Sequence, residues 1–314
     1  MPYCAIDFGK TEYSFDVSPV CNRTSAKIMG CISYLARKFP NLVLDRFGIL
    51  DKNCAAIRLP VLTNWSLVDF SLVYTKNFAF RDLDSCPVLC WSGGIDSTFI
   101  AACFLHEGIN FRVAYNEQSL ADSWSEEILK KLESDNIYCC KMYRLEEYAE
   151  LDNCVTGDGA DILFSPSVDD LIVNSPRNQF GQHMGIFDAL SYVYPNEGKL
   201  LYNKLLNYGK KLRRNISGDR DLSRLINWGT FYYFKRDYFR AVTGAKKENM
   251  IPFFDDPAFM DISYTSYWNS TYEDGCKEDR RKFIASVFGK SVFKKIRRNP
   301  SPYYRPSNLD KLYL

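Results

Sequence analysis

The sequence predicts an α/β fold in which a parallel sheet carries helices on its faces. Strand-like and helix-like segments alternate between residues 88 and 156, and this alternation is typical of parallel sheets connected by right-handed crossovers. The first strand-like segment leads directly into a loop with two adjacent glycines, Ser92–Ser97. After residue 164 the pattern turns helical, without strand alternation. A parallel sheet followed by a helical part is therefore expected.

A boundary between residues 82 and 83 is predicted to divide the 314-residue chain, which is long enough for one large domain or two ordinary ones. Residues 1–82 read as a small α+β region, and residues 83–314 as the sheet domain with its helical C-terminal extension. The smaller region is expected to hold one helix and three short strands, at 25–39, 42–44, 55–59 and 70–73.

In the larger region, apolar runs and helical spacings predict a regular order of elements. Strands are expected at 88–91, 111–115, 137–142 and 153–156, and the helices between them at 97–107 and 123–132. A short helix over 162–164 and longer helices over 188–214 and 221–242 are expected to follow. Ligands on parallel sheets bind outside the carboxyl ends of the strands. The segments that follow the first and last predicted strands are therefore candidate sites.

The composition argues against several classes of protein. Hydrophobic residues make up 46% of the chain and charged residues 25%, as in ordinary globular proteins. The net charge of +2 gives no overall argument for a nucleic-acid or acidic partner. No leader pattern follows Met1, and no apolar stretch has transmembrane length. We therefore expect a cytoplasmic protein without membrane attachment.

Cysteine and histidine usage bears on redox state and metals. Without a secretory signal, the 11 cysteines are expected to be reduced and mostly buried. No Cys-x-x-Cys pair occurs, and the chain has 2 histidines, His106 and His183. A zinc site is therefore not expected.

The segment Ser92-Gly93-Gly94-Ile95-Asp96-Ser97 is the most informative in the chain. A buried strand that turns through two glycines into a helix predicts a phosphate site, because backbone N–H groups and the positive helix end face the anion. Glycine lets the backbone approach the anion closely, and Ser92, Ser97 and Thr98 can add hydroxyl donors. Asp96 would repel phosphates unless it binds Mg²⁺ that bridges to them.

A second motif, Thr156-Gly157-Asp158-Gly159-Ala160-Asp161, follows the last predicted strand of the alternating region. Alone, Gly-Asp-Gly indicates no more than a common turn. Together with the first motif it means more, because two strand ends of a parallel sheet can face the same crevice. Asp96 and Asp161 could then share Mg²⁺ ions that bridge the phosphates.

Together these motifs resemble the synthetase domain of the asparagine synthetase family, which belongs to the PP-loop ATP pyrophosphatases. That family pairs Ser-Gly-Gly-x-Asp-Ser with a Gly-acid-Gly-x-Asp motif after a strand. The segments Ile251-Pro252-Phe253-Phe254-Asp255 and Phe259-Met260-Asp261 look like its Pro-Phe-Leu-Asp segment and the trailing Phe-Leu-Asp. The basic stretch from Lys277 through Arg298 resembles the Lys- and Arg-rich stretch that follows in the family.

The resemblance implies an adenine-nucleotide alpha-hydrolase-like core and a ligase that uses ATP and Mg²⁺ and releases AMP and pyrophosphate. A carboxylate would attack the α-phosphorus of ATP, and ammonia or an amine would then displace AMP to form an amide. The implied metal ligands are Asp96 and Asp161. The implied nucleotide-binding residues are Cys90, Ser92, Gly93, Gly94, Asp96, Ser97, Val113, Thr156 and Gly157.

The resemblance also implies catalytic residues and partners. Asp158 occupies the acidic position that helps the amine step in the family. Lys294 or Lys295, with Arg297 as a third candidate, would stabilise charge on the α-phosphate. The partners would be a small-molecule carboxylate and either ammonia or an amine, free or supplied by a separate protein.

The chain departs from the family pattern at several positions. Ile162 replaces the second acid of the usual Asp-Glu pair, and Cys90-Trp91 replaces the Leu-Leu before the loop. Asparagine synthetases carry a nucleophilic cysteine at position 2, where this chain has Pro2. Cys4 is therefore expected to be structural, and glutamine is not expected to be hydrolysed. An amine within the substrate itself would make it a cyclising enzyme that resembles β-lactam synthetases.

Two other functions remain open at the level of sequence. One is a PP-loop ATP pyrophosphatase that modifies a nucleobase, tRNA or DNA, since such enzymes share the first motif and the basic tail could suit a nucleic acid. The other is a non-catalytic nucleotide-binding relative, which Ile162 and the missing glutaminase suggest.

Overall fold

The computed structural model of the protein describes residues 60–79, 86–121, 124–164, 198–212, 221, 224–225, 249–268 and 277–289. The chain divides into two compact units, each assembled from separate segments. The sheet unit comprises 63–160, 242–262 and 275–314, and the second unit comprises 1–62, 161–241 and 263–274. The predicted boundary between residues 82 and 83 falls outside the described residues.

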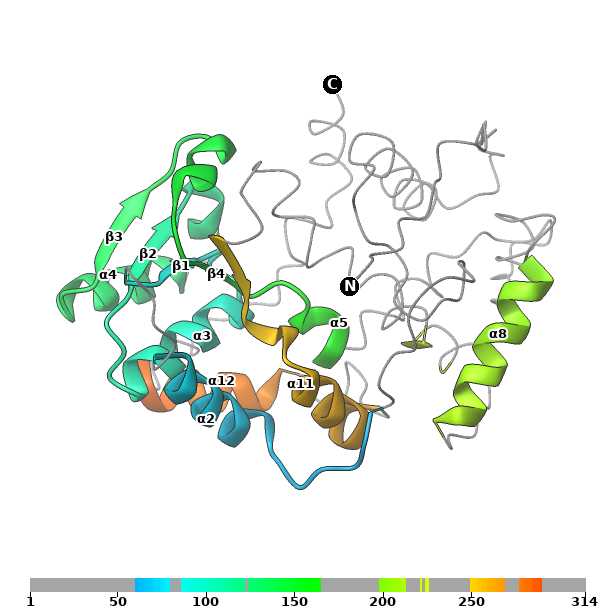
Figure 1. Ribbon diagram of the computed structural model, residues 1–314. Coiled ribbons are helices and arrows are strands. Elements are labelled where there is room, and N and C mark those ends of the chain that lie inside the picture. The colour runs from blue at the N-terminus through cyan, green and yellow to red at the C-terminus, as the bar shows by residue number, and fades with distance from the viewer. Residues whose placement is uncertain are drawn as a thin grey trace, which may run out of the picture. The chain divides into compact units, whose positions relative to one another are not determined.

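A parallel sheet forms the centre of the first unit (Figure 1). Its five described strands are β1 (Val88–Cys90), β2 (Arg112–Tyr115), β3 (Tyr138–Lys141), β4 (Cys154–Thr156) and β5 (Met250–Pro252). They lie in the order β3-β2-β1-β4-β5, and every neighbouring pair is parallel. The predicted α/β class with a parallel sheet is confirmed. The strand order reverses between β1 and β4, and ligands bind at such reversal points in open α/β sheets.

The strand β5 lies in the part of the chain after residue 164, where the sequence pattern is helical without strand alternation. Its three residues, Met-Ile-Pro, are too few to show an alternating pattern, and they stand far along the chain from their neighbour β4. Pro252 cannot donate to a ladder, and a proline is tolerated where a strand lies at the end of the sheet. Such a strand is recognised by its tertiary partner and not by its composition.

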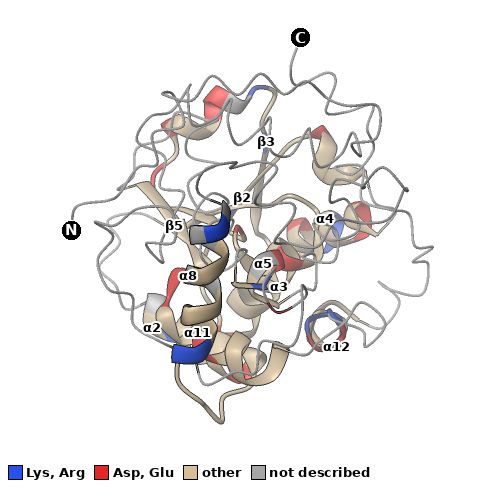
Figure 2. Ribbon diagram, turned by 90° about the vertical axis from the view of Figure 1, so that its right-hand side faces the viewer, with Lys and Arg blue, Asp and Glu red and all other residues tan. Residues whose placement is uncertain are grey.

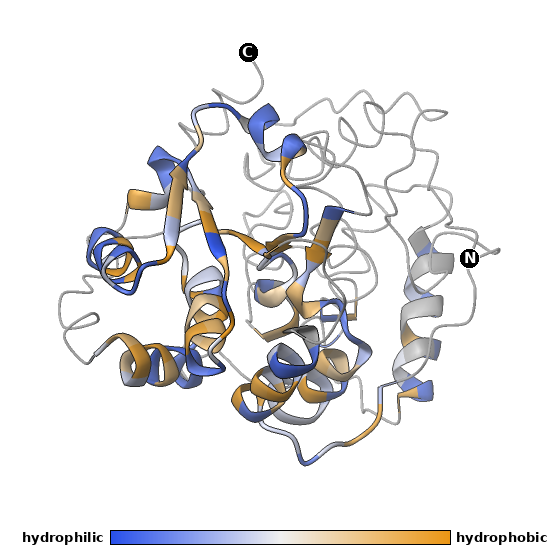
Figure 3. Ribbon diagram, turned by 60° about the vertical axis from the view of Figure 1, so that its left-hand side comes forward, coloured by the Kyte–Doolittle hydropathy of each residue, from blue (hydrophilic) through white to orange (hydrophobic). Residues whose placement is uncertain are grey.

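Helices pack on the sheet and on one another. They are α2 (Leu67–Ala79), α3 (Ile95–His106), α4 (Ser125–Ser134), α11 (Pro257–Ile262) and α12 (Glu278–Phe288), with 3-10 turns η2 (Glu117–Leu120), η3 (Leu145–Glu150) and η6 (Phe253–Asp255). The helix α3 packs on β1, and α2 and α12 pack on α3. In Figure 3 both the strands and the helices carry hydrophobic and hydrophilic colours. The predicted helices at 97–107 and 123–132 are confirmed, with starts displaced by two residues.

The helix α2 corrects the strand predicted at 70–73. Its buried residues recur at helical spacing, at Leu67, Ser71, Tyr74 and Thr75. Two of these four are small and polar, so the buried face does not read as an apolar stripe. Ser66 caps the helix by accepting the Asp69 N–H at 3.1 Å and donating to the Asp69 carboxylate at 2.6 Å.

Aromatic rings of α2 pack against aromatic rings in the segment after β5. Phe253, Phe254 and Phe259 are fully buried, with centroid distances of 5.0 Å between Phe253 and Phe254 and 5.1 Å between Phe254 and Phe259. Phe259 also meets Phe70 of α2 at 4.9 Å, and Tyr74 meets Phe253 at 5.1 Å. The third motif found in the sequence therefore contributes core packing through its aromatic residues.

The second unit is described in part. It contains most of α5 (Ala160–Phe164), together with α8 (Gly198–Lys211) and the turn η7 (Ser263–Tyr267). The Ser263 hydroxyl donates to the Leu163 carbonyl, and the Tyr264 hydroxyl donates to the Leu212 carbonyl at 2.5 Å. The short helix expected at 162–164 is present, and α8 lies within the helix expected at 188–214.

Several sequence predictions fall on residues that are not described. These are the helix at 25–39, the strands at 42–44 and 55–59, and most of the helix at 221–242. Within the described ranges, the helices are all too short or too polar to cross a bilayer.

Candidate functional site

The three sequence motifs all follow strands of the parallel sheet. The Ser92 loop, defined as Ser92–Ser97, follows β1, the Gly157–Gly159 turn follows β4, and Phe253 follows β5. Because the strands are parallel, their carboxyl ends share one edge, and β1 pairs directly with β4. The Ser92 loop and the Gly157–Gly159 turn are therefore neighbours at the point where the strand order reverses.

The Gly157–Gly159 turn lies against the first turn of α3. A Cβ at Gly157 would lie 3.3 Å from the Ser97 nitrogen and 3.5 Å from the Asp96 carbonyl carbon. The preceding residue, Thr156, is only 3% exposed, and its Oγ1 has no hydrogen-bond partner within the described part of the chain. A buried hydroxyl left in this state costs about 1–3 kcal/mol, so a ligand atom that bonded it would recover free energy.

The backbone of the Ser92 loop requires glycine at position 93. Gly93 has a φ of +76°, in the left-handed region that other residues rarely adopt. A Cβ there would lie 1.8 Å from the Ser119 carbonyl oxygen. The loop therefore rests directly on the turn η2, with no space for a side chain between them.

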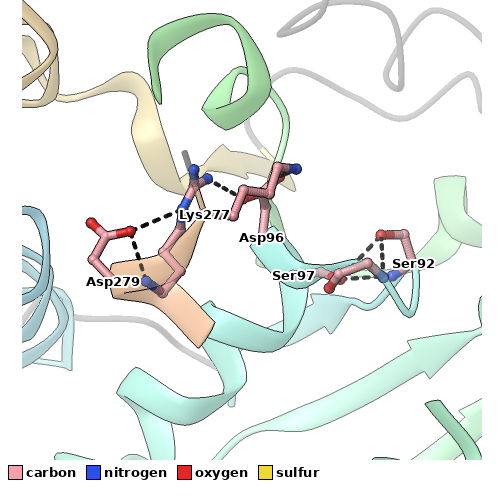
Figure 4. Close-up of polar contacts among 7 residues, drawn as sticks. Ser92, Asp96, Ser97, Lys277 and Asp279 are labelled. Carbon is pink, nitrogen blue, oxygen red and sulfur yellow. Dashed lines mark hydrogen bonds and ion pairs between the residues drawn. The ribbon is translucent and has the colours of Figure 1, made fainter. Parts of the chain in front are cut away.

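On one side of the loop, serine hydroxyls meet backbone N–H groups (Figure 4). The Ser92 N–H donates to the Ser97 Oγ at 3.2 Å, and the Gly94 N–H donates to the Ser92 Oγ at 3.4 Å. The two hydroxyl oxygens are 3.0 Å apart, and the Ser97 hydroxyl donates to the Gly94 carbonyl at 3.1 Å. Polar groups of the loop thus converge at the start of α3, as a phosphate site requires.

Two further serines hold carbonyl groups of the same loop. The Ser119 hydroxyl donates to the Trp91 carbonyl at 2.8 Å, and the Ser125 hydroxyl donates to the Gly93 carbonyl at 3.2 Å. Neither residue was predicted from the sequence. The spacing Asn116-x-x-Ser119, which closes a reciprocal cap at the end of β2, was a usable signal for Ser119. Ser125 carries no comparable local signal.

Asp96 points to α12 and forms ion pairs with two cations (Figure 4). The Lys277 Nζ lies 2.9 Å from the Asp96 Oδ2, and the Arg280 Nη1 contacts the Oδ1. The Arg280 side chain is 0% exposed, whereas those of Asp96 and Lys277 are 13% and 21% exposed. Asp279 lies near the same arginine, with its Oδ1 3.9 Å from the Arg280 Nε.

Lys277 and Arg280 were expected only as members of a basic stretch. Figure 2 shows that α12 carries both signs of charge. Arg280, Ile284 and Phe288 are buried and recur every four residues along α12. A basic residue that falls in line with apolar residues at helical spacing was therefore the available signal for a buried ion pair.

Each oxygen of Asp96 contacts a cationic side chain, Lys277 or Arg280. In the described ranges, no group of three or more His, Cys, Asp or Glu residues is placed to hold a metal. Asp161, in the first turn of α5, belongs to the second unit. The Mg²⁺ shared by Asp96 and Asp161 stays a prediction.

The residues expected beside adenosine lie at the centre of the sheet. Cys90 ends β1 and is buried, and Val113 is fully buried in β2, where it pairs with Leu89. A hydrogen bond with Cys154 and burial raise the pKa of the Cys90 thiol well above its ordinary value, and the charge of Asp158 adds to this shift. Asp158 therefore lies within electrostatic reach of the end of β1. The six described cysteines are free thiols.

Some predicted site residues are not described. Lys294, Lys295 and Arg297 lie outside the described ranges, and so does the side chain of Ile162. Their roles stay predictions.

Neither a scan of known protein-family models nor a search of curated proteins found a match for this chain. The resemblance to asparagine synthetases therefore rests on the motifs and on where they lie in the sheet.

Proposed function

We propose that this protein is an ATP-dependent ligase that adenylates a carboxylate, releases pyrophosphate and transfers the acyl group to ammonia or an amine. The observation that supports this proposal is the position of two motifs. The Ser92 loop and the Gly157–Gly159 turn follow the paired strands β1 and β4 at the reversal of strand order, which is where nucleotides bind in open α/β sheets.

The proposed site divides into a phosphate part and a nucleoside part. Ser92, Gly93, Gly94 and Ser97 would hold phosphate oxygens through N–H and hydroxyl groups at the start of α3, helped by the helix dipole. The nucleoside would lie over the sheet edge, against Thr156, Gly157 and the backbone of Cys90 and Val113. The buried Thr156 hydroxyl, which has no described partner, supports a ligand at this position.

The cations on α12 would help to hold the triphosphate. The Lys277 ammonium is partly exposed and pairs with Asp96 at 2.9 Å, and rotation of its own side chain would bring it to a phosphate oxygen. Arg280 is fully buried and would stay on Asp96. We propose Mg²⁺ as the companion of the ATP phosphates, and assign it no ligand among the described side chains.

The proposed reaction has two steps that balance. A carboxylate oxygen of the substrate forms a bond to the α-phosphorus, and the bond from that phosphorus to the bridging oxygen breaks, so pyrophosphate leaves with the electron pair. An amine nitrogen then attacks the acyl carbon, AMP leaves, and the amine loses a proton. Asp158 is the proposed group for this second step, and Lys294 or Lys295 would stabilise charge on the α-phosphate.

The test is acid-dependent release of pyrophosphate. The protein would be incubated with MgATP and pools of carboxylic acids and amines, while pyrophosphate and AMP are measured and new amides are sought by mass spectrometry. Pyrophosphate release that requires an acid supports the ligase. Release that requires tRNA or DNA would instead identify a nucleic-acid-modifying enzyme, and ATP binding without release would identify a non-catalytic relative.

A further inference from the structure

Two buried serines outside the predicted motifs donate hydrogen bonds to carbonyl groups in and just before the Ser92 loop. Ser119 lies in η2 after β2, and Ser125 begins α4. They stand 28 and 32 residues along the chain from the carbonyl groups to which their hydroxyls donate. Ser119 is 3% exposed and Ser125 is 0% exposed, so water does not compete for these hydrogen bonds.

The geometry of the peptide group gives these bonds a direction. In a planar trans peptide, the C=O and N–H groups point in opposite directions. The Trp91 carbonyl shares its plane with the Ser92 N–H, and the Gly93 carbonyl shares its plane with the Gly94 N–H. By holding the two carbonyls, Ser119 and Ser125 therefore fix the direction of both N–H groups, each opposite to the carbonyl of its own peptide.

The N–H groups turned in this way meet groups that an anion can replace. The Ser92 N–H donates to the Ser97 hydroxyl at 3.2 Å, and the Gly94 N–H donates to the Ser92 hydroxyl at 3.4 Å. Ser92 is exposed and Ser97 is buried, and hydroxyl groups can rotate to donate to an incoming phosphate oxygen. The loop can thus exchange internal hydroxyl contacts for phosphate contacts without a change in its backbone.

The backbone itself has little freedom to turn otherwise. The contact of Gly93 with the Ser119 carbonyl leaves no room for even a Cβ. Ser119 is fixed in turn by Asn116, whose side chain accepts the Ser119 N–H at 3.1 Å and whose N–H donates to the Ser119 Oγ at 3.2 Å. The end of β2 therefore holds the loop that follows β1.

We propose that Ser119 and Ser125 are positioning residues that aim the N–H groups of Ser92 and Gly94 at a phosphate group of the ligand. This inference rests on the proposed function for the identity of the anion as the pyrophosphate part of ATP. The two serines act on phosphate and not on the nucleoside, because the peptide planes that they hold lie in the Ser92 loop.

Binding of two separate probes tests the proposal. Inorganic pyrophosphate and adenosine would each be titrated by calorimetry into the wild-type protein and into Ser119→Ala and Ser125→Ala variants. The matched control is Ser134→Ala, whose hydroxyl lies on the same helix as Ser125 and donates to the Lys131 carbonyl at 2.8 Å. Thermal melts would confirm that each variant is folded at the titration temperature.

We expect each loop-facing variant to bind pyrophosphate about fivefold to tenfold more weakly, as the loss of one directing hydrogen bond implies. Adenosine affinity should stay within about twofold of the wild type, and Ser134→Ala should change neither affinity. Equal losses for pyrophosphate and adenosine would overturn the proposal in favour of general destabilisation. Unchanged pyrophosphate affinity in both variants would also overturn it.

The outcome separates this proposal from the ligase proposal. If pyrophosphate binds and depends on both serines while no acid triggers pyrophosphate release from ATP, the positioning role stands and the ligase fails. If the wild-type protein binds no pyrophosphate, the positioning role fails with the phosphate site itself.

Discussion

Replacement of Asp96 by asparagine should destabilise the fold, whatever its effect on chemistry. The Asp96 carboxylate contacts the guanidinium of Arg280, a side chain that is 0% exposed. It also contacts the Lys277 ammonium at 2.9 Å. Asparagine keeps the shape and one acceptor oxygen but removes the charge. The buried arginine keeps Asp279, whose Oδ1 lies 3.9 Å from its Nε, but loses the charge of Asp96.

The magnitude follows from the burial of the three side chains. Removing one partner of a buried ion pair costs about 3–5 kcal/mol, because the remaining charge is desolvated without compensation. Asp96 is 13% exposed and Asp279 is 33% exposed, and the amide oxygen still accepts a hydrogen bond. We therefore expect a loss near the lower end of that range, about 3 kcal/mol.

Urea unfolding of Asp96→Asn and wild-type protein measures this loss directly. The control is Glu278→Gln on the same helix, since the pair of Glu278 with Lys282 is 3.8 Å long and exposed and should contribute under about 0.5 kcal/mol. Adding Arg280→Met to Asp96→Asn should recover part of the stability, because an apolar side chain tolerates burial. A loss in Asp96→Asn no larger than that in the control would refute the argument that Arg280 depends on this carboxylate.

Three further predictions concern the same unit. Gly93→Ala should abolish pyrophosphate binding and lower the free energy of unfolding well beyond Gly108→Ala. Both glycines have positive φ, but a Cβ at Gly93 meets the Ser119 carbonyl, whereas a Cβ at Gly108 meets nothing within 4 Å. Equal unfolding free energies of the two variants would contradict the clash with Ser119. Thr156→Val should stabilise the protein by about 1 kcal/mol, because it removes a buried hydroxyl without a described partner, and should slow pyrophosphate release; a lower melting temperature would show that the hydroxyl is bonded. Burial raises the pKa of the Cys103 thiol well above 9.0, so the folded protein keeps a proton that the unfolded chain loses, and stability should fall as pH rises above that value. Cys103→Ala should flatten this fall by up to about 1.4 kcal/mol per pH unit, and parallel pH profiles in urea unfolding would contradict it.

The strands and helices from β1 to β4 could be predicted because their signals are local. The strands are short, and β1 and β4 are buried throughout. The helix α3 has every residue from Ser97 to Phe104 buried. The Ser92 loop needs both a strand before it and a helix after it, and its glycines carry that information. The Gly157–Gly159 turn became informative only beside the first motif, and the strand pairing places the two together.

The elements that escaped prediction depend on tertiary contacts. The buried face of α2 includes the polar residues Ser71 and Thr75, so it does not show a continuous apolar pattern. The strand β5 is too short to show alternation of apolar and polar residues. The partners of Asp96 are 181 and 184 residues away along the chain, so no local pattern links them. No local sequence pattern marks Ser125, because its hydroxyl reaches the Gly93 carbonyl only in the folded protein.

The distance along the chain between Asp96 and Arg280 has a consequence for synthesis. The 184 residues that separate them take about 10–40 seconds to translate at rates of about 5–20 residues per second. Strands β1 to β4 can pair during that time, before Arg280 has been synthesised and can pair with the Asp96 carboxylate. A negative charge at the start of α3 then repels phosphate. A nascent chain is therefore expected to form its loop early and to accept an anion only after α12 has emerged and docked.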